Sequence, residues 1–131
     1  GVRIKVISGD NPLTVSRIAK EAGINGSQNY IDATKLKSSQ QLDDALKKYT
    51  VFGRVTPEQK RKIVQCLQKS GNTVAMTGDG VNDVLALEAM SLECILLFVM
   101  FSFAAESFLR YLEKFVDCCY FVRSKLKKQE R

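Results

Sequence analysis

The amino-acid sequence predicts an α/β protein with a doubly wound parallel sheet, and two observations carry this prediction. Short β-branched runs alternate with segments whose apolar residues recur at helical spacing, a pattern typical of parallel sheets. The predicted strands also end in turns that contain glycine or polar residues. With 131 residues and no internal repeat, the chain is expected to be one domain or part of one.

The first predicted strand is the β-branched run at residues 2–7, which ends in the turn Ser8-Gly9-Asp10. Asn11 can cap a helix with Pro12 in its first turn, and Gly23 stops that helix. The other predicted elements follow in order: a brief strand at 30–32, a helix from Ser38 or Ser39, a strand at 51–54, a helix from 56–58 to Gly71, a strand at 72–76 and a helix at 82–90.

Residues 74–83 are the most informative segment of the sequence. A hydrophobic, β-prone stretch ends there in a turn that contains two glycines, two carboxylates and an amide. A carboxylate at the carboxyl end of a buried strand faces the crevice where open α/β sheets bind ligands. Asp79 and Asp83 are hard oxygen donors that converge if the turn leads into a helix, so they suit Mg²⁺ with phosphate. The alternative is a solvated turn before a helix, which would explain a lone Gly-Asp-Gly better.

Three stretches, in the expected order, resemble motifs of the P-type ATPases, ion pumps that form an aspartyl-phosphate. Residues 77–83 match the motif Thr-Gly-Asp-Gly-Val-Asn-Asp. Residues 8–10 are similar to Thr-Gly-Asp, with Ser in place of Thr, and residues 52–60 look like Phe-Ala-Arg-Val-x-Pro-x-x-Lys, with Gly in place of Ala. The resemblance covers residues 1 to about 87. It implies the second half of a haloacid dehalogenase-like, Rossmann-type phosphorylation domain, and hence an incomplete sheet.

The resemblance also implies roles for individual residues. Asp79 would coordinate Mg²⁺ directly, and Asn82 would donate to a phosphate oxygen. Asp83 would bind the water ligands of the metal or accept hydrogen bonds from the loop. Lys60 would place its ammonium against the phosphoryl group, a point charge suited to that task. On spacing alone, the cluster Lys60 to Lys62 would instead be surface charge.

The remaining implied binding residues are Ser8, Gly9, Asp10, Arg54 and Gly78. Ser8 and Gly9 would bind phosphate through the hydroxyl and a backbone amide, and Asp10 and Arg54 would lie near the nucleotide. From the residues alone, Arg54 could equally be a solvated strand end, and Asp10 could be a turn residue.

The activity that the resemblance implies is ATP hydrolysis coupled to cation transport, with Mg²⁺ and ATP as cofactors. The nucleophilic Asp of the motif Asp-Lys-Thr-Gly-Thr is not in the sequence, so we expect the chain alone to be inactive. The implied partners are ATP and the nucleotide-binding, actuator and membrane domains of a full pump. The implied location is the cytoplasmic side of an integral membrane protein, of which this chain is a fragment. The transported cation is unknown, because its ligands would lie in the membrane helices.

Three other functions stay open. A haloacid dehalogenase-like phosphatase shares the strand-end Asp pair, but it needs an Asp-x-Asp motif that the sequence lacks. A non-catalytic Mg²⁺- or nucleotide-binding module would fit the missing nucleophile. Nucleic-acid binding is disfavoured: the net charge of +6 comes mostly from residues 123–131, where no aromatic residues are interleaved.

Cysteine and histidine usage excludes several kinds of site. The sequence contains no histidine, which removes His-based acid–base chemistry and His-ligated metals. Its four cysteines show no C-x-x-C spacing, so a zinc site or a thioredoxin-like motif is not expected. Free thiols in a reducing cytosol are the interpretation that fits best.

From Glu88 onward the sequence departs from the resembled family. Residues 94–105 form an uncharged apolar run, which is shorter than the about 20 residues that a bilayer-spanning helix needs, so a buried helix or strand is expected there. An amphipathic pattern follows at residues 108–116. We therefore expect a partial phosphorylation domain at residues 1–90. Residues 91–131 are expected to be a helical or irregular tail, poorly packed or exposed, that arose by a shifted reading frame or as a divergent segment.

Overall fold

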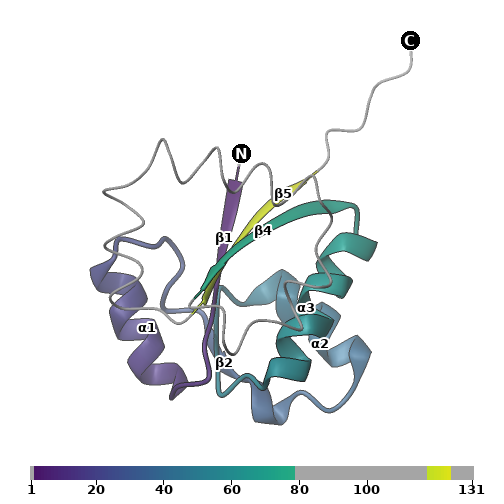
Figure 1. Cartoon of the computed structure of the whole chain (residues 1–131). Coiled ribbons are helices and arrows are strands. Elements are labelled where there is room, and N and C mark those ends of the chain that lie inside the picture. The colour runs from purple at the N-terminus through teal and green to yellow at the C-terminus, as the bar shows by residue number, and fades with distance from the viewer. Residues whose placement is uncertain (1, 79–117, 125–131) are drawn as a thin grey trace.

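The computed structural model describes residues 2–78 and 118–124, and Figure 1 draws the rest of the chain as a thin grey trace. The predicted helix at 82–90 and the apolar run at 94–105 lie outside the described residues. The described elements are β1 (Val2–Ile7), α1 (Pro12–Glu21), β2 (Tyr30–Asp32), a 3₁₀ helix (Ala33–Lys35), α2 (Ser39–Lys48), β3 (Val51–Gly53), α3 (Pro57–Lys69), β4 (Asn72–Gly78) and β5 (Cys118–Ser124). The predicted alternation of strands and helices is confirmed as far as β4.

Local capping chemistry sets where the helices begin. The side chain of Asn11 accepts a hydrogen bond from the backbone N–H of Leu13 at the start of α1. Ser38 and Thr56 each form a capping box with a glutamine three residues later, at the starts of α2 and α3. These starts were predicted, because a cap depends only on residues that are neighbours in the sequence.

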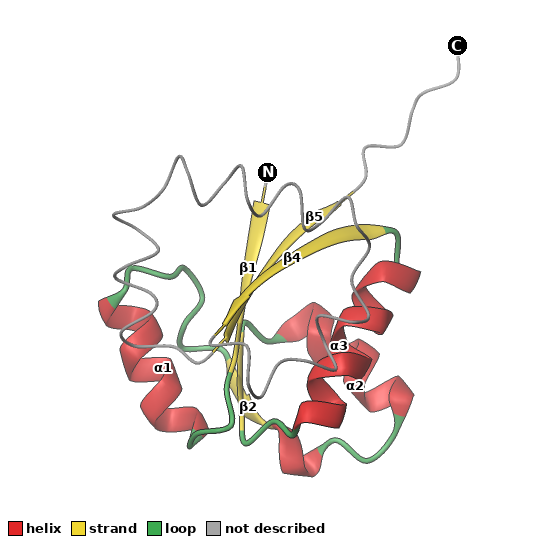
Figure 2. Ribbon diagram, in the orientation of Figure 1, coloured by secondary structure: helices red, strands yellow, loops and turns green. Residues whose placement is uncertain are grey.

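The five described strands form one sheet in the order β2-β3-β1-β5-β4. β1, β2 and β3 are parallel to one another, whereas β5 is antiparallel to both β1 and β4. β4 therefore runs in the same direction as β1. Figure 2 shows α1 on one side of the sheet and α2 and α3 on the other. This is the predicted doubly wound α/β arrangement, with helices on both faces.

Each face of the sheet has its own hydrophobic core. Successive residues of a strand point to opposite faces, and Val6 and Ile7 of β1 are both fully buried. Val6 packs with Val15 and Ala19 of α1. Ile7 belongs to the larger core on the other face, together with Phe52, Val74, Met76 and apolar residues of α2 and α3. The carboxyl-terminal half of β1, residues 5–7, is therefore covered on both faces, as expected for a parallel sheet.

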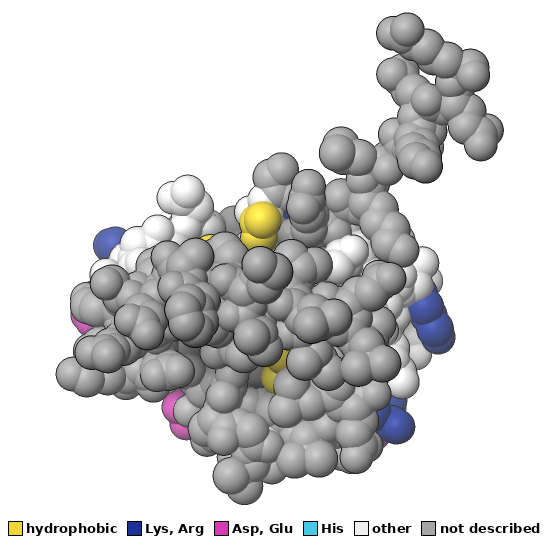
Figure 3. Space-filling model, turned by 45° about the horizontal axis from the view of Figure 1, so that its top comes forward, with side chains coloured by type: hydrophobic (Ala, Val, Ile, Leu, Met, Phe, Trp, Pro, Cys, Tyr) yellow, Lys and Arg dark blue, Asp and Glu magenta, His cyan; other side chains and the backbone are white. Residues whose placement is uncertain are grey.

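Charged side chains are visible at the margin of the molecule in the space-filling view of Figure 3, where described residues reach the surface. The exposed large hydrophobic side chains among the described residues are those of Val2, Leu13 and Tyr30. No helix in the described ranges combines the length and the apolar character that a membrane span requires.

Residues 118–124 correct one expectation about the tail. We predicted a helical or irregular C-terminal segment, but these residues form β5 in the interior of the sheet. The segment reads Cys-Cys-Tyr-Phe-Val-Arg-Ser, and its aromatic and β-branched residues favour a strand. The prediction was wrong here because it was based on the departure of the tail from the family's sequence pattern, which gives no information about pairing with β1 and β4.

Candidate functional site

The candidate site lies at the edge of the sheet where the strands that run with β1 have their carboxyl ends. Open α/β sheets bind ligands at this edge, because loops from several strands converge there. The turn at residues 8–10 follows β1, Asp32 ends β2, Arg54 follows β3, and Gly78 ends β4. The structure therefore brings to one edge the predicted residues of three separate sequence motifs.

Hydrogen bonds join the loop after β1 to the loop after β3. The backbone N–H of Arg54 donates to the carbonyl of Asp10 over 2.8 Å, and that of Val55 donates to the carbonyl of Ser8 over 2.9 Å. The Ser8 side chain is buried, and its Oγ accepts a hydrogen bond from the backbone N–H of Asp10 over 3.1 Å. Ser8 thus shapes the turn in which Gly9 and Asp10 lie exposed to solvent.

Gly9 has space around it in this turn. A Cβ added to residue 9 would have the carbonyl oxygen of Val55, 3.8 Å away, as its nearest described neighbour, which is an ordinary van der Waals contact. The fold therefore does not require a glycine at this position. If function requires glycine here, the reason would be a ligand that approaches the backbone of residue 9 closely.

Arg54 has a backbone conformation that side chains rarely adopt. Its φ of 53° makes it the one non-glycine residue with positive φ among those that the structure describes. Such a conformation costs an ordinary residue on the order of 1 kcal/mol. The bond to Asp10 holds the backbone in this turn, while the guanidinium extends toward β2.

Asp32 receives the Arg54 guanidinium at the end of β2. Its Oδ2 lies 3.0 Å from Nη1 of Arg54, and its Oδ1 accepts hydrogen bonds from the backbone N–H and the hydroxyl of Thr34. The bonds from the Thr34 hydroxyl and backbone, together with Arg54, lower the pKa of the Asp32 carboxyl, which is therefore ionised at neutral pH. Asp32 was not predicted as a site residue, although an Asp two residues before a Thr at a strand end favours such a turn.

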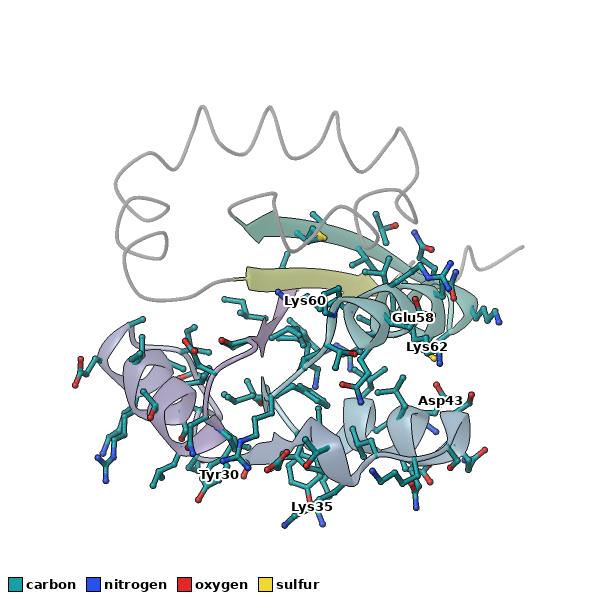
Figure 4. The ribbon with its side chains drawn as sticks, turned by 60° about the horizontal axis from the view of Figure 1, so that its bottom comes forward. Tyr30, Lys35, Asp43, Glu58, Lys60 and Lys62 are labelled. Carbon is teal, nitrogen blue, oxygen red and sulfur yellow. The ribbon has the colours of Figure 1, made fainter. Side chains whose placement is uncertain are left out.

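Lys60 is buried in the first turn of α3, with only 3% of its surface exposed. Figure 4 shows it on the side of the helix that faces the strands, with Lys62 on the outer side, and Lys62 is exposed. Between them in sequence, Arg61 pairs with Glu58 over 2.6 Å at the surface. The alternative that all three basic residues are surface charge does not hold for Lys60. Lys60 therefore lies within the fold beside the strands, and not in an exposed basic cluster.

The metal-binding part of the prediction lies beyond the described residues. Asp79, Asn82 and Asp83 are outside them, and Gly78 is described only as the last residue of β4. Within residues 2–78 and 118–124, no three His, Cys, Asp or Glu side chains gather as metal ligands would. The assignment of Mg²⁺ to Asp79 and Asp83 therefore stays a prediction.

Known proteins are similar to the part of the chain that contains β1 to β4 and the helices between them. A model of the haloacid dehalogenase-like hydrolase family matches residues 1–91. The calcium-transporting ATPase CtpE of Mycobacterium tuberculosis is 54% identical over 88 residues, which cover 66% of this chain and 11% of that protein. The probable cation-transporting ATPase exp7 of Streptococcus pneumoniae is 51% identical over 86 residues, again 66% of this chain and 11% of the relative.

A third relative is the magnesium-transporting ATPase, P-type 1, of Salmonella typhimurium, which is 44% identical over 89 residues, 66% of this chain and 10% of that protein. The chain thus spans about a tenth of the length of these relatives. No solved structure matches the chain. The resemblance to P-type cation-transporting ATPases is confirmed over the first two thirds of the sequence, and the chain belongs to the haloacid dehalogenase-like hydrolase family.

Proposed function

We propose that the chain is part of a P-type cation-transporting ATPase and supplies the half of the phosphorylation domain that binds Mg²⁺ and stabilises the phosphoryl group. The observation that carries the proposal is the identity of 44–54% to pumps named for calcium, magnesium or cation transport, over the segment that contains all three motifs. The partners would be ATP and the remaining domains of such a pump, on the cytoplasmic side of a membrane.

The described residues support this role by their chemistry. Phosphoryl transfer is catalysed mainly by positioning and by offsetting negative charge, which requires a metal ion, a lysine and backbone amides. Lys60 is a buried cation in the first turn of α3, the helix that follows β3, and Gly9 lies in an exposed turn at the carboxyl end of β1. We propose that Lys60, Ser8 and Gly9 contact the phosphoryl group.

The other predicted residues divide between the metal and the nucleotide. Asp79 and Asp83 have the carboxylate oxygens that Mg²⁺ prefers, and they would hold the ion that neutralises the phosphate charge. Asn82 and the backbone of Gly78 would face the phosphate oxygens. Asp10 and Arg54, whose backbones are joined by a hydrogen bond, would lie nearer to the nucleotide.

A ligand titration tests the metal and phosphate assignment. The full chain would be titrated with Mg²⁺ and orthovanadate, a phosphate mimic, and its melting temperature followed. We expect weak but saturable stabilisation that requires both components and is absent in Asp79→Asn, since a ligand that binds the native state raises its stability. Asp44→Asn, at an exposed position of α2, is the matched control and should respond as wild type. Equal stabilisation of wild type and Asp79→Asn would refute the assignment.

A further inference from the structure

Asn25 and Gly26 form an exposed turn in the loop between α1 and β2. The backbone N–H of Ser27 donates to the carbonyl of Ile24 over 3.3 Å, so Asn25 and Gly26 are the two central residues of a β-turn. Gly26 has a φ of 78° and Asn25 has a negative φ, as a type II turn requires. Asn25 is exposed to solvent, whereas Ile24 and Ser27 on either side of the turn are buried.

The fold requires the glycine of this pair. A Cβ added to residue 26 would be 2.8 Å from Oγ1 of Thr50, and the positive φ disfavours any residue that has a side chain. Among the described residues, no backbone carbonyl accepts a hydrogen bond from the Gly26 N–H. The nitrogen of Gly26 is therefore hindered neither by a side chain of its own nor by a backbone partner, and it is adjacent in sequence to an exposed asparagine.

We propose that Asn25 is a site of spontaneous deamidation and isoaspartate formation, a covalent modification of the main chain. The backbone nitrogen of Gly26 loses its proton and attacks the side-chain carbonyl carbon of Asn25. A C–N bond forms to give a cyclic imide, the bond from that carbon to the side-chain nitrogen breaks, and ammonia leaves with the proton. Water then opens the imide at either carbonyl. One product has aspartate at position 25, and the other has isoaspartate, in which the main chain runs through the side-chain carbon atoms.

The other asparagines lack this combination of features. Asn25 is the one asparagine that the sequence places before a glycine. Asn11 precedes a proline, which has no N–H to react. Asn29 and Asn72 precede a tyrosine and a threonine, whose side chains hinder the attacking nitrogen. The side-chain amide of Asn72 also donates to the carbonyl of Leu67 over 2.9 Å, which restrains it.

Isoaspartate would change the geometry of a turn that is held on both sides. The carbonyl of Ser27 accepts a hydrogen bond from the buried Oγ of Ser16 in α1 over 2.8 Å. Ile24 belongs to the hydrophobic core that α1 covers. Isoaspartate adds one carbon atom to the main chain between these two anchors, so the turn cannot keep both of them in place. Aspartate at the exposed position 25 leaves the main chain unchanged, so we expect only isoaspartate to loosen the connection between α1 and β2.

Ageing of the full chain tests the modification. The chain would be incubated at mildly alkaline pH, digested in acid, where the imide forms slowly, and analysed by mass spectrometry. In the peptide that contains residue 25, we expect the gain in mass that results when an acid replaces an amide, before any gain at Asn29 or Asn72. Asn25→Gln should lose this gain completely, because glutamine would have to form a larger ring. Asn29→Gln, at another exposed position of the same loop, is the matched control and should age as wild type.

Methyl labelling and melting distinguish the two products. A methyltransferase specific for isoaspartate, supplied with a labelled methyl donor, should label the aged peptide that contains residue 25. Asp79 also precedes a glycine and can form the imide by losing water, but its peptide would carry label without a change in mass. The isoaspartate form, purified by chromatography, should melt roughly 4 °C below wild type, the shift that the loss of one contact produces in a chain of this length. Asn25→Asp should melt as wild type.

Each step of the proposal has a result that would overturn it. An unchanged mass in the wild-type chain, over a period in which a synthetic peptide of residues 22–30 deamidates, would show that the fold protects Asn25. A gain in mass that persists in Asn25→Gln would place the modification at another residue. A gain at residue 25 without methyl label would exclude the cyclic imide. An isoaspartate form that melts as wild type would show that the connection between α1 and β2 tolerates the longer main chain.

Discussion

Gly53 lies against Pro12 so closely that no side chain fits between them. A Cβ added to residue 53 would be 2.4 Å from Cα and 2.5 Å from N of Pro12. Both of these neighbours are backbone atoms at the start of α1, so they cannot move aside as the tip of a side chain can. This contact fixes the end of β3 against the helix that follows β1, and it sets the spacing of the two loops at the candidate site.

We therefore expect Gly53→Ala to destabilise the chain. Forcing an extra carbon into a packed region shifts backbone and commonly costs about 1–3 kcal/mol. Urea denaturation of both proteins would measure the loss in the free energy of unfolding. An unchanged midpoint in Gly53→Ala would mean that the loops are not as close as the structure has them.

Gly9→Ala should behave differently, since the nearest described neighbour of the added Cβ is 3.8 Å away. We expect its free energy of unfolding to change by less than about 0.5 kcal/mol, as is usual for substitutions without a packing consequence. Under the proposed function, the same substitution should weaken stabilisation by Mg²⁺ and orthovanadate, because it blocks close approach to the backbone. Undiminished ligand stabilisation in Gly9→Ala would remove Gly9 from the phosphate site.

The features that the sequence predicts are those that depend on local spacing. The caps at Asn11, Ser38 and Thr56 could be predicted because each bonds to a residue two or three positions away. The alternation of strands and helices follows from apolar periodicity in the same way. Of the site residues, the burial of Lys60 could not be predicted, because its neighbours Arg61 and Lys62 suggest a charged surface.

The two features that were not predicted from the sequence, the Asp32–Arg54 pair and the position of β5, both depend on long-range contacts. The Asp32 carboxylate accepts a hydrogen bond from Arg54, which is 22 positions away, and no local sequence pattern indicates that these two residues pair. β5 pairs with β1 across more than a hundred residues, so no local pattern places it inside the sheet. In both cases the local sequence is compatible with the observed structure, but the order of the strands in the sheet decides which residues meet.

The conformation of Arg54 leads to a comparison of two substitutions. Arg54→Gly and Arg54→Ala both remove the ion pair with Asp32 and differ only in the residue that must adopt a φ of 53°. Glycine reaches this conformation without a steric penalty, so we expect the Gly variant to be more stable than the Ala variant by about 1 kcal/mol. Parallel urea titrations would measure the difference. Greater stability of the Ala variant would contradict the left-handed conformation of this residue.

The missing nucleophile predicts the catalytic behaviour of the isolated chain. Because no Asp-Lys-Thr-Gly-Thr segment is present, we expect no ATP-dependent aspartyl-phosphate. The chain would be incubated with Mg²⁺ and γ-labelled ATP, quenched in acid and examined for bound label. Label that survives acid and disappears with hydroxylamine would show an acyl-phosphate, and would mean that the chain contains a nucleophile that we did not identify.

Lys5 predicts how stability depends on pH. Its side chain is 7% exposed in β1, and its ammonium donates to the carbonyl of Tyr49 at the end of α2. Burial, with a smaller contribution from the Arg3 charge, lowers the Lys5 pKa from 10.5 to about 8. Well below pH 8 the lysine is protonated in both the folded and the unfolded chain, so it adds no pH dependence there.

Between about pH 8 and 10.5 the unfolded chain retains a proton on Lys5 that the folded chain has released. Stability rises with pH wherever the unfolded state binds more protons. We therefore expect Lys5 to make the free energy of unfolding increase across this range. Urea denaturation at several pH values, in wild type and in Lys5→Met, isolates this effect from other groups that titrate there. Lys37→Met, at an exposed position, is the control and should keep the wild-type pH dependence. If the difference between wild type and Lys5→Met stays constant from pH 7.5 to 10.5, the Lys5 ammonium is not buried as the structure has it.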